Sequence, residues 1–201
     1  MRDQIQSIKQ DAKDEVKYWT KKQGRILDRG KRLAALVDRY VGRSFKTVAD
    51  IGCGPRCGIF GVKKYDTMFA VDPLWDGYRK KGVDEVPEGV KTITGFAETF
   101  RLPHKARLIV SINALDHSGD LQKSLDNIWD NLQRGGVFFL HLHLRKRKEF
   151  DEIHRMKLTE KILDEMLSNW KVIKKEVFDR DFLYDIDKKT PKMFVALMEK
   201  V

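Results

Sequence analysis

Hydrophobic positions along the chain follow two different periods. In residues 5–22 and 26–40 they recur every three or four positions, which predicts two amphipathic helices separated at Gly24. After residue 46 the pattern changes to short apolar runs, which predict buried strands. These runs cover residues 47–51, 68–71, 91–94, 108–112 and 137–143.

Helical patterns separate the predicted strands, most clearly over residues 121–132. Alternating strands and helices predict an α/β fold with a doubly wound, mostly parallel sheet covered by helices on both faces. Residues 170–178 and 192–198 read as two further strands with no room for a crossover helix, so we expect a C-terminal antiparallel hairpin. The chain then divides into an N-terminal helical extension, residues 1–46, and one main domain, residues 47–201.

Length and composition favour a single globular protein with its own core. The chain has 201 residues, of which 41% are hydrophobic and 35% are charged. No apolar run approaches the roughly 18 residues of a membrane span, and the first residues lack a secretion signal. We therefore expect a soluble, cytoplasmic protein. Cys53 and Cys57 alone give neither a disulfide framework nor a metal set, so no metal is expected.

Positive charge is concentrated at the N-terminal end. Residues 1–46 hold 13 Lys and Arg against 6 Asp and Glu, a net charge of +7 out of +10 for the chain. Such a surface attracts RNA and other anions, but it is equally typical of a solvated helix face. A second basic run, Arg145 to Lys148, is followed at once by acidic residues, and we expect it to be solvated.

A glycine-rich turn follows the first predicted strand. Gly52, Gly54 and Gly58 allow the backbone to turn sharply and approach a ligand. Asp72, twenty residues after Gly52, closes the second predicted strand, where a carboxylate can accept hydrogen bonds from ribose hydroxyls. Nicotinamide dinucleotides and S-adenosylmethionine both use this architecture. The dinucleotide fingerprint would need glycine at Cys57, and Asp50 before the turn suits a cationic ligand better than a pyrophosphate.

Five segments together resemble the class I S-adenosylmethionine-dependent methyltransferases, of the type 11-like group. They are ADIGCGP, FAVDPL, GFAETFRLP, LIVSINALDH and LQRGGVFFLHLHL, in the order the family has them. The resemblance runs from about Thr47 to the C-terminus and departs at Arg56, where the family has a third glycine. It implies the Rossmann-like methyltransferase fold, a seven-stranded sheet and S-adenosyl-L-methionine as cofactor.

The resemblance also implies which residues would bind that cofactor. Around the methionine portion it places Asp50, Gly52, Cys53 and Gly54; at the ribose, Asp72; beside the adenine, Pro73, Leu74, Ala97 and Glu98; and at the floor near the methyl group, Asn113 and Ala114. Glu98 has a second reading as a carboxylate at the start of a helix, where the helix dipole favours it.

Candidate catalytic residues follow the fourth predicted strand. His117 is the first choice for a general base, with Asp116 beside it, because an imidazole takes up a proton near neutral pH. The alternative is that both residues end the strand and that Ser118 or Asp120 caps the next helix. His143 is a further catalytic candidate. It shares one face of the fifth strand with His141, and a buried structural pair is the alternative.

Taken together, the sequence predicts methyl transfer from S-adenosylmethionine to an oxygen or nitrogen of a small molecule or glycan. Two alternatives stay open. The basic N-terminal helices would suit an RNA methyltransferase, and the absence of a definite base would suit a module that binds the cofactor without catalysis. A nicotinamide oxidoreductase ranks last. The sequence leaves the oligomeric state open.

Overall fold

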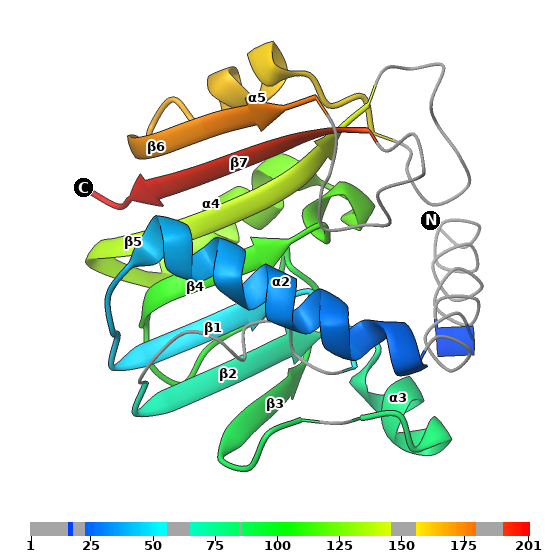
Figure 1. Ribbon diagram of the computed structural model, residues 1–201. Helices are drawn as coiled ribbons and strands as arrows, with labels where there is room; N and C mark the ends of the chain where they lie inside the picture. Colours follow the sequence, from blue (N-terminus) through cyan, green and yellow to red (C-terminus); the bar gives the residue numbers. More distant parts are fainter. Residues whose placement is uncertain (1–15, 18–22, 56–64, 85, 146–155, 180–190) are drawn as a thin grey trace.

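A seven-stranded sheet forms the centre of the molecule, with strands in the order β3-β2-β1-β4-β5-β7-β6 (Figure 1). The computed structural model describes residues 16–17, 23–55, 65–84, 86–145, 156–179 and 191–201. The first five strands pair in parallel, and β7 pairs antiparallel with both β5 and β6. This arrangement confirms the doubly wound α/β prediction and its C-terminal antiparallel hairpin.

The strands coincide closely with the apolar runs of the sequence. Their bounds are β1 Thr47–Ile51, β2 Thr67–Asp72, β3 Val90–Thr94, β4 Ala106–Ile112, β5 Leu132–Leu144, β6 Lys171–Phe178 and β7 Lys192–Glu199. Strands β1, β4 and β5 lie in the middle of the sheet and are almost fully buried, because helices cover both their faces. β3 and β6 are the two edge strands.

Helices pack on both faces of the sheet, and each face has its own hydrophobic core. The helices are α2 Gln23–Val41, α3 Trp75–Lys81, α4 Leu121–Asn131 and α5 Glu160–Met166, with a short 3-10 helix, η1, at Leu115–His117. Val37 of α2 and Trp75 of α3 pack with Val110 on one face. Ile128 of α4 and Leu163 of α5 pack with Ile109 on the other. Figure 1 shows α2 lying across its face of the sheet.

Two boundaries differ from the sequence prediction. Strand β5 begins at Leu132, directly after α4, whereas the apolar run predicts a start at residue 137. The extra residues include Gly135, which has a φ of +68°, and the register of β4 against β5 shifts in this stretch. At the other end of the chain, α2 begins at Gln23, so Gly24 lies in its first turn and does not separate two helices.

The N-terminal extension contributes to the same core as the sheet. Tyr40 of α2 packs edge-on against Phe139 of β5, with ring centroids 5.5 Å apart. Val16 is also buried in this core, and apart from Val16 and Lys17 the first predicted helix lies outside the described residues. Within the described ranges, no helix combines the length and apolar character that crossing a membrane would require.

Candidate functional site

The residues expected to bind a cofactor lie where parallel strands end at one edge of the sheet. Gly52 follows β1, Asp72 ends β2, Ala97 follows β3 and Asn113 follows β4. Strands β3, β2, β1 and β4 are adjacent in that order, so these four positions are neighbours along the edge. Ligands of open α/β sheets bind at this edge, outside the carboxyl ends of the strands.

A tight turn of backbone follows β1. The amides of Gly52 and Cys53 both donate to the carbonyl oxygen of Val71 on β2, at 2.8 and 3.3 Å. Gly52 and Gly54 have φ angles of +70° and +66°, the left-handed region that glycine adopts without a steric penalty. The turn thus needs glycine at two positions, and both had been singled out from the sequence.

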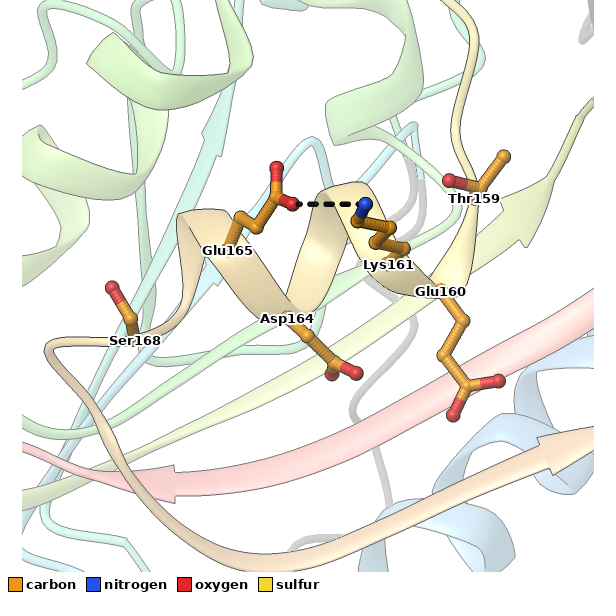
Figure 2. Close-up of a pocket in the computed structure, with 6 residues that line it drawn as sticks. All are labelled: Thr159, Glu160, Lys161, Asp164, Glu165 and Ser168. Atoms are coloured by element: carbon orange, nitrogen blue, oxygen red, sulfur yellow. Dashed lines mark ion pairs between the residues drawn. The ribbon is translucent and has the colours of Figure 1, made fainter.

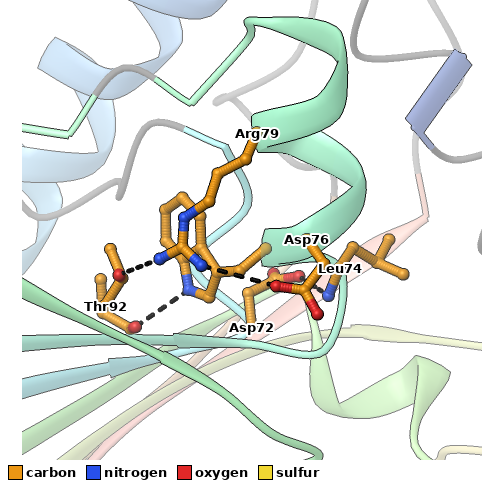
Figure 3. Close-up of polar contacts among 7 residues, drawn as sticks. Asp72, Leu74, Asp76, Arg79 and Thr92 are labelled. Atoms are coloured by element: carbon orange, nitrogen blue, oxygen red, sulfur yellow. Dashed lines mark hydrogen bonds and ion pairs between the residues drawn. The ribbon is translucent and has the colours of Figure 1, made fainter.

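Asp72 holds this turn in place. Its Oδ2 accepts a hydrogen bond from the Gly54 amide at 2.9 Å. Its Oδ1 accepts one from the Leu74 amide at 2.8 Å, and Figure 3 shows these two residues. The side chain belongs to a residue only 5% exposed. Asp72 therefore joins the glycine turn to the loop that leads from β2 into α3.

Helix α3 is fastened to the strands on either side of Asp72. The indole Nε1 of Trp75 donates to the carbonyl oxygen of Ala70 at 3.0 Å, and the guanidinium of Arg79 donates to Thr92 Oγ1 at 2.5 Å (Figure 3). Arg79 also lies 3.5 Å from Asp76 on the exposed side of the helix. These contacts fix the start of α3, and with it the loop of Pro73 and Leu74, beside the glycine turn.

The backbone after β4 closes the site from the other side. Asn113 has a φ of +49°, the only positive φ of a non-glycine residue in the described part of the chain, and its amide donates to the His141 carbonyl oxygen at 2.9 Å. This turn brings Ala114 against Gly52: a Cβ built on Gly52 would lie 2.3 Å from the Ala114 Cβ. Ser111, which sequence reasoning did not identify, donates its hydroxyl to the Ile51 carbonyl oxygen at 2.9 Å.

The segment after β3 points its side chains in two directions. Ala97 and Phe100 pack into the core shared with α4, whereas Phe96 is 50% exposed. Glu98 Oε1 accepts hydrogen bonds from the amides of Gly119 and Asp120, at 2.7 and 3.3 Å. These amides lie just before α4, so the reading of Glu98 as a helix-start carboxylate describes its observed contacts.

Asp116 and His117 lie together in η1, shortly after Asn113 and Ala114, the residues expected to form the floor of the site. Asp116 is buried, and its Oδ1 lies 3.8 Å from His117 Nε2. Its Oδ2 lies 4.0 Å from Nε of Arg145, whose side chain is only 12% exposed. Arg145 was expected to be solvated. Instead, its backbone pairs with Leu158 in an antiparallel bridge, which turns the guanidinium inward beside Asp116.

Three further candidates lie on the α2 face of the sheet. Asp50 is buried within β1. His141 and His143 are both buried on β5, and their rings meet at 5.7 Å between centroids and 66° between planes. The prediction that the two histidines share one face is confirmed. Among the described residues, no three His, Cys, Asp or Glu side chains gather as metal ligands.

A surface hollow lies elsewhere, on α5. Figure 2 shows the six residues that line it, Thr159, Glu160, Lys161, Asp164, Glu165 and Ser168, all from α5 or its immediate ends. Lys161 and Glu165 form an exposed ion pair at 4.0 Å. Asp164 pairs with Lys175 of β6 at 2.9 Å, which raises the pKa of that lysine through the hydrogen bond. The hollow includes none of the residues at the carboxyl ends of the strands.

Some sequence candidates cannot be placed. Arg56, Cys57 and Gly58 lie outside the described residues, as do the aromatic pair Tyr18 and Trp19. Cys53 is partly buried and forms no disulfide within the described residues, and its thiol donates to the Gly54 carbonyl oxygen at 3.3 Å. The described turn therefore ends at Pro55.

Comparison with known proteins shows the fold. No family model matches the chain. No curated protein matches it in sequence. Solved structures match over most of the chain at low identity. Among them are an S-adenosylmethionine-dependent methyltransferase from Clostridium acetobutylicum and two methyltransferases solved with S-adenosylhomocysteine.

Three of them illustrate the similarity. A chain from the complex between the Haloferax volcanii Trm112 methyltransferase activator and its proposed methyltransferase has a TM-score of 0.67 and 14% identity, covering 92% of this chain and 96% of that one. NodS, an N-methyltransferase from Bradyrhizobium japonicum solved with S-adenosylhomocysteine, has a TM-score of 0.62, 13% identity and coverages of 86% and 85%. The Burkholderia thailandensis 1,6-didemethyltoxoflavin-N1-methyltransferase, solved with that compound and S-adenosylhomocysteine, has a TM-score of 0.61, 16% identity and coverages of 86% and 78%.

Proposed function

We propose that this protein is an S-adenosylmethionine-dependent methyltransferase. The observation that carries the proposal is the joint between Asp72 and the glycine turn, packed against Ala114. Gly52 and Gly54 give this turn its positive φ angles, and the Gly54 amide donates a hydrogen bond to Asp72 at the tip of the next strand. Neighbours of the same fold bind S-adenosylhomocysteine in two of the solved structures.

The residues present fit an adenosine that carries a sulfonium. Gly52 lacks the side chain that would collide with Ala114, which lets the turn after β1 pack closely against the backbone that follows β4. Asp72, at the tip of β2, would accept hydrogen bonds from the ribose hydroxyls. Asp50, Cys53 and Gly54 would lie by the methionine portion, and Asn113 and Ala114 at the floor.

S-adenosylmethionine supplies an electrophilic methyl group when it is bound. The chain contributes position and a proton acceptor: holding the nucleophile in line at near-attack distance is the main requirement of such a displacement. His117, 27% exposed in its side chain, would take the proton of an acceptor hydroxyl on its imidazole. The Asp116 carboxylate beside it would stabilise the charged ring. His143 is the second candidate base, from β5.

For the acceptor we propose a small molecule or glycan that reacts through oxygen or nitrogen. The Burkholderia neighbour was solved with 1,6-didemethyltoxoflavin and is described as its N1-methyltransferase. We extend that acceptor class to this chain because the two folds match over 86% of this chain. Polymer acceptors such as RNA are the alternative that the basic N-terminal segment favours.

Within the N-terminal extension, residues 1–46, α2 packs in the core of the sheet, so the part around Val16 would be the one that closes over the cofactor, from the side of α3. Val16 packs on this helix: a Cβ built on Gly77 would lie 3.0 Å from Val16 Cγ2. Because α3 begins three residues after Asp72, a segment held at Gly77 lies near the proposed ribose site. We infer that the extension faces the substrate.

Calorimetry with S-adenosylmethionine tests the cofactor. We expect binding by the parent protein, loss of binding for Asp72→Ala and parent-like binding for Asp76→Ala. Asp76 is the matched control because it is an exposed acid on the neighbouring helix that holds no part of the glycine turn. The proposal fails if the parent protein gives no heat at high micromolar ligand.

Methyl transfer is then measured with radiolabelled S-adenosylmethionine against two pools, small metabolites and glycans in one and RNA in the other. Label in the first pool supports the proposed acceptor class, and label only in RNA rejects it in favour of the alternative. Tight cofactor binding without label in any acceptor would indicate a binding module.

A further inference from the structure

A row of basic residues crosses the edge of the sheet where the parallel strands begin. Strand pairing places one residue of each of five adjacent strands side by side, namely Val48, Leu108, Val137, Glu199 and Lys171. Every one of these strands carries a cation on or just outside this line. The cations, together called the basic edge, are Lys46 before β1, Lys105 and Arg107 at the start of β4, Arg134 near the start of β5, Lys200 after β7 and Lys171 at the start of β6.

The basic edge lies opposite the proposed cofactor site. Gly52 and Asp72 mark the carboxyl ends of their strands, whereas Lys46 directly precedes β1. At about 3.3 Å per residue, β1 separates Lys46 from Gly52 by about 20 Å. Figure 1 shows β1, β5 and β6 beginning on the side where the C-terminus lies and ending on the opposite side. A ligand bound at the basic edge therefore does not occupy the site of methyl transfer.

Acidic partners are scarce along the basic edge. Lys171 has one, because it pairs with Glu199 at 2.8 Å. Two further exposed acids, Asp66 and Asp130, lie next to the starts of β2 and β5. The remaining exposed cations of the basic edge form no ion pair within the described ranges; they are Lys46, Lys105, Arg107 and Arg134. This end of the sheet therefore has an excess of positive charge.

Lys200 shows how close together these cations lie. Its Nζ donates to the carbonyl oxygens of Trp129 and Leu132, at 2.7 and 3.0 Å, which ties the end of β7 to the end of α4. Burial lowers the pKa of Lys200, and the charge of Lys105 lowers it further, whereas Asp130 raises it. The basic edge thus holds like charges within reach of each other. An anion bound there would relieve their repulsion.

The shape of the basic edge suits an extended anion. Adjacent strands lie about 4.8 Å apart, so five strands spread their cations over about 20 Å. Each strand of B-form DNA carries a phosphate about every 3.4 Å along the helix axis, so several phosphates can meet such a row. Arg107 donates to the Arg134 carbonyl oxygen at 3.3 Å, which brings two guanidinium-bearing residues together. A guanidinium can bind a phosphate through two parallel hydrogen bonds.

We propose that the basic edge binds the phosphate backbone of a nucleic acid strand, apart from the site of methyl transfer. The inference does not depend on the proposed function, and a strand held here is not thereby a methyl acceptor. Contacts to phosphates carry no sequence information, so binding should be independent of sequence and should weaken steeply with salt. RNA and DNA share this phosphate chemistry, and the experiment includes both.

Fluorescence anisotropy measures binding of labelled oligo(U) and oligo(dT), each of about 15 nucleotides, at a series of salt concentrations. The parent protein should bind with an affinity that falls as salt rises. A triple variant of the basic edge carries Lys46→Gln, Lys105→Gln and Arg134→Gln, all at exposed positions. It should bind about tenfold or more weakly, and its slope of log affinity against log salt should be smaller by about 2, because each lost contact contributes about 0.7.

A matched triple variant removes the same charge from the N-terminal segment, which the sequence offers as the alternative basic surface. It carries Lys9→Gln, Lys13→Gln and Lys17→Gln. This variant should bind within about threefold of the parent, with the parent's salt slope. Thermal melts check that both variants are folded. Vesicles of phosphatidylcholine with phosphatidylserine serve as a second probe, because Val172 and Ile173 beside Lys171 are exposed apolar residues that a lipid surface would contact.

Binding of either oligonucleotide that is weakened only in the basic-edge variant supports the inference and identifies RNA or DNA as the strand. Parent-like binding by the folded basic-edge variant would overturn it. Equal losses in both triple variants would also overturn it, by showing that net charge alone governs binding. Binding of the vesicles without binding of either oligonucleotide would replace the nucleic acid with a lipid surface. None of these results bears on the proposed function, which calorimetry with S-adenosylmethionine tests separately.

Discussion

A Cβ atom placed on Gly52 would lie 2.3 Å from the Cβ of Ala114, well inside van der Waals contact. The two residues follow adjacent strands, β1 and β4, and are far apart in the chain. Gly52 also has a φ of +70°. Two independent constraints therefore require glycine at position 52: the left-handed backbone conformation and the close approach of Ala114.

Gly52→Ala should destabilise the protein by about 2–5 kcal/mol, because the left-handed backbone and the overlap with Ala114 both cost energy. Chemical denaturation measures the change. The double variant Gly52→Ala with Ala114→Gly removes the overlap but keeps the backbone cost, so it should recover about 1–3 kcal/mol relative to Gly52→Ala with Ala114 intact. Additive effects of the two substitutions would contradict the contact.

The sequence predicted the sheet well because buried parallel strands consist of short runs of apolar residues. Residues 47–51 coincide with β1, and 192–198 fall within β7. It predicted β5 poorly, since Leu132 continues directly from a helix whose apolar period it also satisfies. Because Leu132 fits both the helical pattern of α4 and the apolar run of β5, the sequence shows no boundary between the two elements.

The sequence predicted those site residues that depend on local structure, and it missed those that depend on contacts between distant segments. Gly52 and Asp72 are identified by local sequence, because a turn and a strand tip have their own residue preferences. The position of Arg145 depends on its bridge to Leu158, which is a contact between segments that no local pattern encodes. The same holds for the contact of Glu98 with Gly119. Long-range contacts of this kind decide what each charged side chain can do.

Asn113 should show a reversal of the usual preference for alanine over glycine. Both Asn113→Ala and Asn113→Gly remove the side chain, so the difference between them isolates the backbone at φ +49°. We expect Asn113→Gly to be the more stable of the two by about 1 kcal/mol, because glycine adopts the left-handed region freely. Urea denaturation of the two variants side by side measures it. Equal stability would mean that the turn relaxes to another conformation.

Asp120 should stabilise α4 as its N-cap. Its Oδ1 accepts a hydrogen bond from the Lys123 amide at 3.0 Å, which confirms one of the two caps expected from the sequence. Asp120→Ala leaves that amide without its partner and should cost about 1 kcal/mol in unfolding free energy. Asp120→Asn, which keeps a capping oxygen, should cost much less. A loss of equal size in both variants would assign the effect to charge, and the cap would not be its cause.

Tyr40 of α2 donates a hydrogen bond to Glu176 of β6, and this contact should make stability depend on acid pH. The hydrogen bond lowers the pKa of Glu176 below its usual 4.5, with Lys174 lowering it further. A carboxyl whose pKa is depressed by folding contributes stability that is present above the unfolded pKa and lost as pH falls through the folded one. Tyr40→Phe removes the donor, so the parent protein should exceed the variant in stability at neutral pH, by about 1 kcal/mol.

The difference between parent and Tyr40→Phe should then shrink as pH falls below 4.5, because protonated Glu176 no longer accepts the hydrogen bond as an anion. Unfolding free energies at a series of pH values from 7 to 3 measure this. Asp179→Asn is a suitable control, since the pKa of Asp179 is also depressed but its partner is Lys192 and not the helix. The control should show its own acid dependence and leave the Tyr40 effect unchanged. A difference between parent and Tyr40→Phe that stays constant down to pH 3 would show that the phenol acts through packing on Phe139 and not through Glu176.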